Sequence, residues 1–349
     1  MNETNPRQQY ILNLINQKGT IGRLTIEEEI EKVYPASKPT VARDLALLLQ
    51  KGFIKTSGKG KNTVYSANVN NPLLKQFNVD QYFLLDPDQR SDAKKTFNFD
   101  IYKYLTNLFS QKEKEDIQSV NKDFLKESLK ITLDVYQKEL ERFIIEFAWK
   151  SSKIEGNTYS LLDTETLIKQ KIEAQGHSKE EATMILNHKQ AFDLVLKHKD
   201  EFKTISLTQI TELHNYIVHE MGITTGLRSH SVGITGTTYL PLDNTWQIQE
   251  ALEKLVEVLK KTTFPLEKAL IAGVMLAYIQ PFADGNKRTS RMLANAILLA
   301  QDFYPLSYRS VDESTYKKAL ILFYEQNSIY ALKNIFIEQY KFALQTYFR

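Results

Sequence analysis

The fold of this chain is decided by one stretch of sequence, "YIQPFADGNKRTSRMLAN", residues 278–295. Within it, Gly285 and Asn286 accept turn conformations that are closed to bulkier residues, so backbone N–H groups are free to point at an anion. The apolar spacing of the residues that follow predicts a helix starting at this turn. A helix N-terminus adds the positive end of its dipole at the same place. The stretch therefore predicts a phosphate or nucleotide site.

Charged residues around the turn strengthen this prediction. Lys287, Arg288 and Arg291 follow it, and the two arginines share one helix face. Asp284 stands directly before the turn, where its carboxylate is a candidate ligand for a Mg²⁺ ion that bridges phosphates. A simpler interpretation is a basic helix start whose arginines pair with nearby acids, but the full string is more specific than that pattern requires.

Composition bounds the class of protein. The chain has 349 residues, 42% hydrophobic and 25% charged, and is long enough for two or three domains with cores of their own. It has no cysteine, which excludes disulfides and thiolate metal sites and fits a reducing compartment. Without an apolar signal-peptide core or an apolar run of about 18 residues, we expect a cytoplasmic protein with no membrane span. The six histidines lack HExxH spacing and indicate no metal site.

Residues 1–70 are the most basic part of the chain, with ten Lys/Arg against six Asp/Glu in a protein whose net charge is +3. Their pattern predicts a helix at residues 7–18, a second from a capping box near Thr25, and a third at residues 37–52. The stretch "FIKTSGKGKNTVYSA" (53–67) alternates, turns and alternates again, which predicts a hairpin.

Three helices and a basic hairpin in this order resemble a winged helix-turn-helix domain, as in many bacterial regulators. The third helix is similar to a recognition helix and the hairpin to a wing, which implies contacts with DNA phosphates or base edges. A second interpretation stays open, because winged helices also serve as protein-docking or dimerisation modules and a net charge of +4 is modest for a DNA-binding domain. The candidate DNA contacts are Thr40, Arg43, Lys55, Lys59 and Lys61.

The pattern of residues 71–349 predicts a connector followed by a helical domain. Turn residues concentrate in residues 71–96, and from 97 to 349 almost every segment has helical apolar spacing. The exception is "GLRSHSVGITGTTYLPLD" (226–243), two short β-prone pieces around Gly236 that predict a small hairpin. We therefore predict a mainly α fold: an all-helical core with a β-hairpin, preceded by the winged helix-turn-helix domain.

The string "IQPFADGNKRTSR" (279–291) resembles the signature of the Fic (Fido) family, H-P-F-x-[DE]-G-N-[GK]-R-x-x-R. The likeness extends over roughly residues 97–345, including "ITELHNYIV" and "YKKALILFYEQN". Members transfer a nucleotide part of ATP, usually AMP, to a Ser, Thr or Tyr hydroxyl of a target protein. The resemblance implies ATP and Mg²⁺ at the loop, with Asp284 on the metal. It also implies nucleotide contacts from Gly285, Asn286, Lys287, Arg288 and Arg291.

The β-prone stretch resembles the family's flap, a hairpin that holds the target segment by strand addition. The sequence does not name the target protein or the modified side chain. Family members often self-associate, which implies a homo-oligomer that no motif here reports. The flap residues in this sequence are Val232, Gly233, Ile234, Thr235, Gly236, Thr237, Thr238 and Tyr239.

A third element, "SSKIEGN" (151–157), resembles the family's inhibitory motif, [ST]-x-x-x-E-[GN]. The motif residues are Ser151, Glu155 and Gly156, on a helix expected around residues 145–160. The resemblance implies a salt bridge between Glu155 and Arg291, an arginine that would otherwise take the γ-phosphate of ATP.

The chain departs from the signature at its first position, where Gln280 replaces the family's histidine. That histidine is the general base for the target hydroxyl. A glutamine oxygen does not accept a proton near neutral pH, and losing a positioned base typically costs ~10²–10⁴-fold in rate. Three explanations stay open: a pseudo-enzyme that binds nucleotide and signals through its N-terminal domain, a natural variant that activates the hydroxyl in another way, and an engineered inactivation.

Lys287 is a milder departure, because lysine at this position is typical of the Doc branch, which phosphorylates its target; AMP and phosphate transfer both stay open. Our first hypothesis is a Fic-type protein adenylyltransferase, autoinhibited by Glu155 and with catalysis impaired at Gln280. The second is a nucleotide-sensing, DNA-binding transcriptional regulator with a non-catalytic Fic domain. The third is a scaffold whose winged helix docks a protein.

Overall fold

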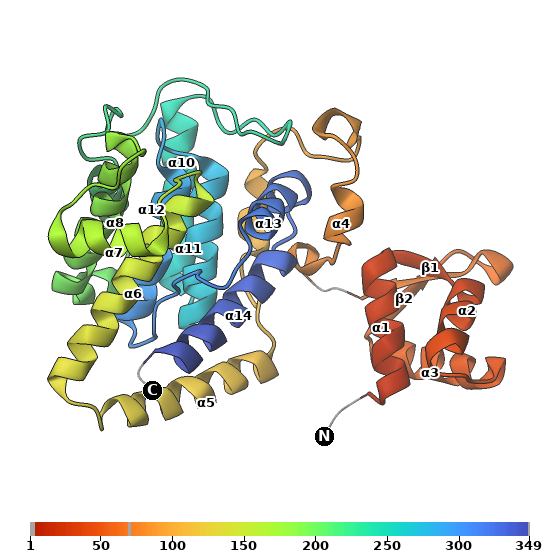
Figure 1. The fold of residues 1–349 in the computed structure, drawn as a ribbon. Helices are drawn as coiled ribbons and strands as arrows, with labels where there is room; N and C mark the ends of the chain where they lie inside the picture. Colours follow the sequence, from red (N-terminus) through yellow and green to blue (C-terminus); the bar gives the residue numbers. More distant parts are fainter. Residues whose placement is uncertain (1–3, 69–70, 348–349) are drawn as a thin grey trace. The chain divides into compact units, whose positions relative to one another are not determined.

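The computed structural model describes residues 4–68 and 71–347, which divide into two compact units (Figure 1). The boundary after Arg90 lies inside the connector expected at residues 71–96. One unit comprises Met1–Arg90 with Asn327–Tyr330, and the other comprises Ser91–Gln326 with Ala331–Arg349.

The first unit contains the expected three helices and hairpin in the expected order. Its strands form one antiparallel sheet in the order β1-β3-β2, so the hairpin of β2 and β3 is extended by β1 along the other edge of β3. The elements are α1 (Pro6–Lys18), β1 (Thr20–Gly22), α2 (Arg23–Val33), α3 (Lys38–Gln50), β2 (Ile54–Ser57), η1 (Gly60–Asn62), β3 (Val64–Ala67), η2 (Pro72–Leu74), α4 (Val79–Tyr82) and η3 (Pro87–Gln89), where η marks a 3₁₀ helix.

The start of α2 differs from the sequence expectation. The helix begins at Arg23, directly after Gly22, and no side chain caps its first turn. The capping box expected near Thr25 is therefore wrong. The physical reason is that Gly22 pairs with Val64 in the sheet, so the chain enters the helix straight from strand β1.

One apolar cluster holds this unit together, and a buried acid links two of its helices. Asp44 on α3 is 3% exposed and accepts hydrogen bonds from the side chains of Arg7 and Gln8 on α1. These partners satisfy a charge that burial alone would destabilise. The cluster consists of Ile11, Leu14, Ile15, Ile21, Ile26, Ile30, Val41, Leu45, Leu48 and Ile54.

The second unit is almost entirely helical. In the described ranges, no helix has both the length and the apolarity needed to cross a membrane. Its elements are η4 (Phe99–Tyr104), α5 (Gln111–Ser128), α6 (Leu133–Ile154), α7 (Leu161–Gln170), α8 (Lys179–Lys197), η5 (Lys199–Lys203), α9 (Leu207–Ile217), α10 (Thr245–Lys261), α11 (Pro265–Ile279), α12 (Asn286–Ala300), α13 (Glu313–Gln326) and α14 (Tyr330–Thr346).

Local sequence sets where several of these helices start. α5, α8 and α9 each begin after a serine that is followed three residues later by Glu or Gln. Both halves of the capping box form in each, so two otherwise unpaired backbone N–H groups are satisfied at each start. The pairs are Ser110 with Glu113, Ser178 with Glu181, and Ser206 with Gln209.

Two central helices, α11 and α12, carry the signature stretch (Figure 1). Every residue of α11 from Leu266 to Ile279 is buried. A Cβ at Gly273 would lie 3.4 Å from the carbonyl oxygen of Ser290 and 3.6 Å from the Cβ of Ala294, so this glycine lets the two helices approach closely. Helices α8 and α9 pack against α12, and α10 and α13 pack against α11. The loop between α11 and α12 is thereby fixed at both ends.

The stretch 226–243 is not the expected β-hairpin, and this prediction is wrong. Within it only Leu240 forms a β-bridge, and no strand is present. Two of its backbone N–H groups bond outside the stretch: that of Leu240 to the oxygen of Lys95 at 2.8 Å, and that of Arg228 to the oxygen of Pro281 at 3.0 Å. These two bonds join the segment to neighbouring elements, and the bonds within it come from side chains, as between Arg228 and the carbonyls of His230 and Leu242, rather than from a strand ladder.

Candidate active site

The signature stretch forms a short loop whose course two residues determine. Gln280 ends α11 in the left-handed conformation (φ 50°, ψ 60°), and Gly285 (φ 78°) precedes α12. A positive φ is easy for glycine, but it is strained for a residue with a side chain and clusters at functional sites. The backbone is thus strained at the position where the signature has its histidine.

The Asn286 side chain closes this loop. Its Oδ1 accepts from the Phe282 N–H (2.9 Å) and its Nδ2 donates to the Phe282 oxygen (2.8 Å). Phe282 is fully buried and stacks on His214, with ring centroids 3.7 Å apart. The His214 Nε2 in turn donates to the carbonyl oxygen of Asp284 (3.0 Å), since that oxygen can only accept. Burial lowers the pKa of His214 to about 4, so the ring is neutral near pH 7. Asn286 therefore shapes the loop, and its backbone N–H at the start of α12 remains for a ligand.

Gly285 is a position where the loop does not tolerate a side chain. Besides the positive φ, a Cβ there would lie 2.7 Å from the Cγ1 of Val218, which is itself buried. We expect Gly285→Ala to lower the free energy of unfolding by about 2 kcal/mol, from backbone strain plus overpacking, as measured by urea denaturation. In the double variant with Val218→Ala, the losses should be less than additive. Full additivity would contradict a direct clash.

Gln280 is buried beside a tyrosine, and its amide side chain is not a base that could take up a proton near neutral pH. Its Nε2 donates to the oxygen of Ala277 (2.6 Å), which leaves the amide oxygen for other partners. Tyr324 of α13 lies beside it, and burial raises the pKa of that phenol well above its usual value. Both groups are therefore neutral near pH 7, and neither is a general base.

Arg228 fastens the flap segment to this loop, and nothing in the sequence pattern marks it. It is 3% exposed. Its Nε donates to the carbonyl oxygen of Gln280 at 2.7 Å, and its other nitrogens donate to the carbonyls of His230 and Leu242. The arginine is thus a positioning residue for the backbone of Gln280.

A cavity of about 460 Å³ lies beside the loop and gathers parts that are far apart in sequence. It is bordered by the loop and the start of α12, the end of α6, the first half of the flap, and one side of α13. Histidine is not among the bordering residues. These are Glu155, Val232, Gly233, Ile234, Thr235, Gln280, Ala283, Asp284, Asn286, Lys287, Lys317, Leu320, Ile321 and Tyr324.

The eight flap residues divide into two groups. Those from 232 to 235 border the cavity, whereas those from 236 to 239 do not. In the second group, Thr237 donates its hydroxyl to buried Glu325 of α13 (2.6 Å). Tyr239 is fully buried and donates its hydroxyl to the oxygen of Tyr278 (2.9 Å). The second half of the flap therefore anchors the segment, while the first half faces the cavity.

The second signature arginine is held by the motif that resembles the inhibitory element. Arg291 is 1% exposed. Its Nε donates to the hydroxyl of Ser151 and its Nη2 to the Ser151 carbonyl, both at 2.9 Å. The same Nη2 lies 2.9 Å from Oε1 of Glu155. Glu155 and Arg291, which the sequence analysis expects to form a salt bridge, are therefore in contact.

Glu155 has a second cation that the sequence analysis did not foresee. Its Oε2 lies 2.8 Å from Nζ of Lys287. Burial by itself would raise the pKa of Glu155, but Arg291 and Lys287 outweigh it and lower the value to about 2. The carboxylate is thus ionised at any physiological pH. Gly156, the last residue of the motif, has φ 103° and turns the chain after α6.

His188 on α8 supports Ser151 from behind. Its Nδ1 lies 2.8 Å from the carbonyl oxygen of Met184, so Nδ1 carries the proton. Its Nε2, 2.8 Å from the Ser151 hydroxyl, is then an acceptor. Burial lowers the pKa of His188 to about 3, which keeps this tautomer neutral. His188 therefore orients the hydroxyl that meets Arg291, a role that no spacing in the sequence indicates.

The first signature arginine is not among the residues that border the cavity. Arg288 is 3% exposed, and burial lowers its pKa. Its Nη2 lies 3.3 Å from Oδ2 of Asp284 and its Nη1 lies 3.2 Å from the sulfur of Met221. Of the three signature cations, only Lys287 borders the cavity itself.

Asp284 has the chemistry of a partial Mg²⁺ site. Its side chain is 69% exposed and borders the cavity, and one oxygen accepts from the N–H of Gly285. The described residues contain no group of three or more side chains suited to a metal. Mg²⁺ commonly binds through one carboxylate with phosphates and water as its other ligands, so a single exposed carboxylate beside a candidate phosphate site fits it.

The candidate DNA contacts lie on the surface of the first unit. Arg43 on α3, Lys55 on β2 and Lys59 in the turn after β2 are exposed. Thr40 is half-buried, with its hydroxyl 2.9 Å from that of Ser37. The side chain of Lys61 lies outside what the structure describes.

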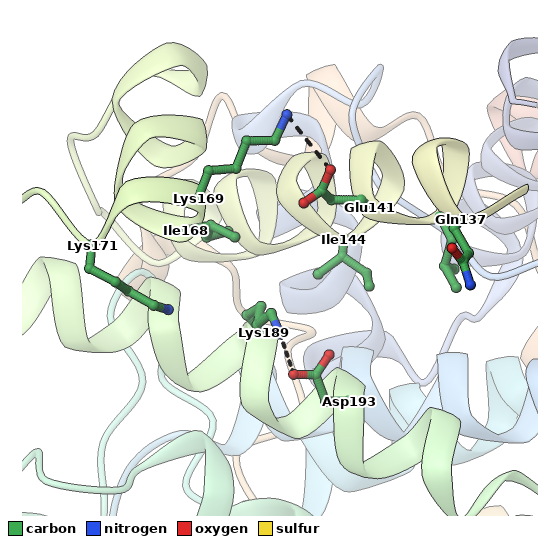
Figure 2. A pocket seen from close by; sticks show the side chains of 9 residues that line it. Gln137, Glu141, Ile144, Ile168, Lys169, Lys171, Lys189 and Asp193 are labelled. Carbon is green, nitrogen blue, oxygen red and sulfur yellow. Dashed lines mark hydrogen bonds and ion pairs between the residues drawn. The ribbon is translucent and has the colours of Figure 1, made fainter. Parts of the chain in front are cut away.

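A second cavity, of about 540 Å³, lies between α6, α7 and α8 (Figure 2). None of its lining residues belongs to the signature, the flap or the inhibitory motif. Four of its five charged groups form two pairs, Lys169 with Glu141 and Lys189 with Asp193, and Lys171 is the fifth (Figure 2). The candidate site is therefore the cavity beside the signature loop.

Comparison with known proteins identifies the family of this domain. Residues 204–298 match the Fic/DOC family. A protein adenylyltransferase Fic from Nematostella vectensis is 32% identical over 178 residues, covering 49% of this chain and 41% of that protein. Protein adenylyltransferase fic-1 from Caenorhabditis elegans is 28% identical over 169 residues, covering 46% and 32%. The chain thus spans less than half the length of these curated relatives.

Solved structures agree on the fold. Fic-1 from C. elegans superposes with a TM-score of 0.56 at 21% identity, covering 67% of this chain and 70% of that chain. A Fic domain containing signaling protein from Bacteroides thetaiotaomicron gives 0.54 at 20%, covering 67% and 96%. Residues 204–298 form a Fic/DOC domain, and the mainly helical Fic fold expected from the sequence is confirmed.

Proposed function

We propose that the protein is a Fic-type protein adenylyltransferase that is autoinhibited by Glu155 and slowed by Gln280. One observation carries the proposal: a single cavity is bordered by the start of α12, by Glu155 and by residues 232–235 of the flap. These three parts correspond to a phosphate-binding helix start, an inhibitory carboxylate and a target-binding edge. Curated relatives named protein adenylyltransferase support the same activity.

ATP fits this cavity through its phosphates and its base. The phosphates would meet the first N–H groups of α12, where the helix dipole is positive, and the amine of Lys287. Asp284 would hold the Mg²⁺ ion that neutralises part of the phosphate charge. Leu320 and Ile321 of α13 provide apolar surface for a base, with Tyr324 beside them.

In the proposed reaction, the oxygen of a target hydroxyl forms a bond to the α-phosphorus of ATP. The bond from that phosphorus to the oxygen bridging to the β-phosphate breaks, and pyrophosphate leaves. The hydroxyl proton has no acceptor at Gln280, so it passes to solvent or to a phosphate oxygen. Gln280 then orients the hydroxyl with its amide oxygen without activating it, which supports slow rather than absent transfer.

Glu155 is proposed to inhibit by occupying cations that ATP needs. A carboxylate at 2.9 Å from Arg291 takes the place of a phosphate group, so the nucleotide meets a filled site. Replacing Glu155 with glycine frees that arginine. Because Glu155 borders the cavity, water enters the vacated space and solvates Arg291, and the variant is expected to fold.

The experiment is calorimetric titration of ATP with Mg²⁺ into the protein and into Glu155→Gly. We expect the variant to bind ATP about 10- to 100-fold more tightly, the value of one charge-assisted hydrogen bond or more. Asp134→Gly is the matched control, since it removes one exposed carboxylate from the same helix at its far end. No binding at millimolar ATP to either the parent or Glu155→Gly would reject the nucleotide site.

A second candidate function is a DNA-binding regulator that senses nucleotide. The exposed Arg43, Lys55 and Lys59 on α3 and the hairpin of the first unit favour it. It requires duplex DNA to bind with an affinity that falls steeply with salt. This function also requires that the first unit is a winged helix-turn-helix domain. We keep that assignment as a proposal, alongside the proposed adenylyltransferase activity.

A further inference from the structure

We propose that Glu155 withholds two cations from ATP rather than one, with Lys287 as the second. The inference rests on the proposed function, because it concerns how the same carboxylate regulates the same nucleotide site. It goes beyond the expected pair of Glu155 with Arg291. It also changes the expected role of Lys287, from a nucleotide ligand that is always available to one that Glu155 keeps occupied.

The geometry assigns one cation to each carboxylate oxygen. Oε1 of Glu155 lies 2.9 Å from Arg291, and Oε2 lies 2.8 Å from Lys287. Both distances are short enough for direct ion pairs, so neither cation is a distant neighbour. A carboxylate with both oxygens engaged in charge-assisted contacts is held more firmly than one engaged at a single oxygen.

Burial shows that the Lys287 contact is not a loose surface pair. The Glu155 side chain is 12% exposed and that of Lys287 is 32% exposed. Solvent therefore screens the charge of Lys287 in part and that of Glu155 only weakly. A pair of fully exposed residues, by contrast, would contribute little to stability. The charges of both cations also lower the pKa of Glu155, to about 2.

Lys287 is the cation best placed to meet phosphate if Glu155 were absent. It is the second residue of α12, and its side chain borders the cavity, whereas buried Arg291 reaches the carboxylate from within the core. Among the described residues, Glu155 is the only carboxylate within ion-pair distance of Lys287. Removing Glu155 would thus release one cation at the cavity wall and another behind it.

Lys317 of α13 provides a comparison within the same cavity. It also borders the cavity, but no ion pair joins it to a carboxylate among the described residues. Its charge is therefore available to ATP whether or not Glu155 is present. Lys287 and Lys317 are two lysines of one cavity that differ in whether the inhibitory glutamate occupies them.

The test compares each lysine in two backgrounds, with Glu155 and with Glu155→Gly, by calorimetric titration of ATP with Mg²⁺. We expect Lys287→Met to weaken ATP binding at most about twofold when Glu155 is present, because the amine is already occupied. In Glu155→Gly the same change should weaken binding about tenfold or more, the value of a charge-assisted contact. Lys317→Met should weaken binding by the same factor in both backgrounds.

Equal losses for Lys287→Met in both backgrounds would overturn the inference, and so would the absence of any loss in Glu155→Gly. A thermal unfolding cycle of Lys287→Met and Glu155→Gln tests the contact without ATP, with an expected coupling of about 1–2 °C in Tm. If no variant binds ATP, the proposed function and this inference fail together, and a coupling in Tm then identifies the contact as purely structural.

Discussion

Gln280→His in the Glu155→Gly background is expected to raise the initial rate of AMP transfer by about 10²–10⁴-fold. The physical reason is that position 280 borders the proposed nucleotide cavity, and an imidazole there accepts the proton that the glutamine amide leaves in place. The backbone at this position already holds a residue with a side chain at φ 50°, so histidine adds no new strain. The measurement is incorporation of label from α-labelled ATP into the protein or into lysate proteins.

Two controls make this result specific to a base. Gln280→Asn keeps an amide and should give no gain, and the gain with histidine should fall as the pH drops below about 6.5, where imidazole is protonated. Gln280→His with Glu155 retained should show a smaller gain, because Arg291 and Lys287 stay occupied. A histidine variant that binds ATP but labels nothing, in either background, would show that the lost base does not limit the reaction.

The secondary structure was predictable where it depends on local sequence. The helices at 7–18 and 37–52 follow from apolar spacing, and the hairpin at 53–67 follows from alternation around a turn. The start of α2 was not predictable in this way, because it depends on Gly22 pairing with Val64 far along the chain. The flap failed for the same reason: Arg228 and Leu240 bond to Pro281 and Lys95, which no local pattern reveals.

The candidate site was predictable as a set of residues but not as a set of contacts. The signature and the inhibitory motif named Glu155 and Arg291, which are in contact at 2.9 Å. The sequence treated Lys287 as a phosphate ligand, and only the fold shows that Glu155 reaches it from the end of α6. His188 had no signal at all, because its role depends on the packing of α8 behind Ser151.

These contacts give the inhibitory motif two physical functions. Glu155 neutralises a buried guanidinium and Ser151 accepts hydrogen bonds from it, which makes both residues part of the folded core. The same carboxylate borders the cavity, which makes it part of the proposed regulation. Stability and the proposed inhibition therefore meet at Arg291, and a variant that removes this arginine measures how much of the stability depends on these contacts.

Arg291→Met is expected to lower the free energy of unfolding by roughly 3 kcal/mol, as measured by urea denaturation. The Arg291 side chain is fully buried, and its removal leaves Glu155 with one cation and Ser151 with an unpaired carbonyl. Lys287→Met is the matched control, because it removes the other cation of the same carboxylate from a side chain that is 32% exposed. We expect it to cost under about 1 kcal/mol.

The double variant Arg291→Met with Glu155→Met identifies the cause of that loss. An apolar pair in place of a buried ion pair is often neutral for stability, so the double variant should regain most of what Arg291→Met loses. If the double variant is as unstable as the sum of the single ones, the loss comes from packing around Arg291 rather than from its pair with Glu155. Equal costs for Arg291→Met and Lys287→Met would likewise contradict the view that Arg291 is the structural half of this contact and Lys287 the exchangeable half.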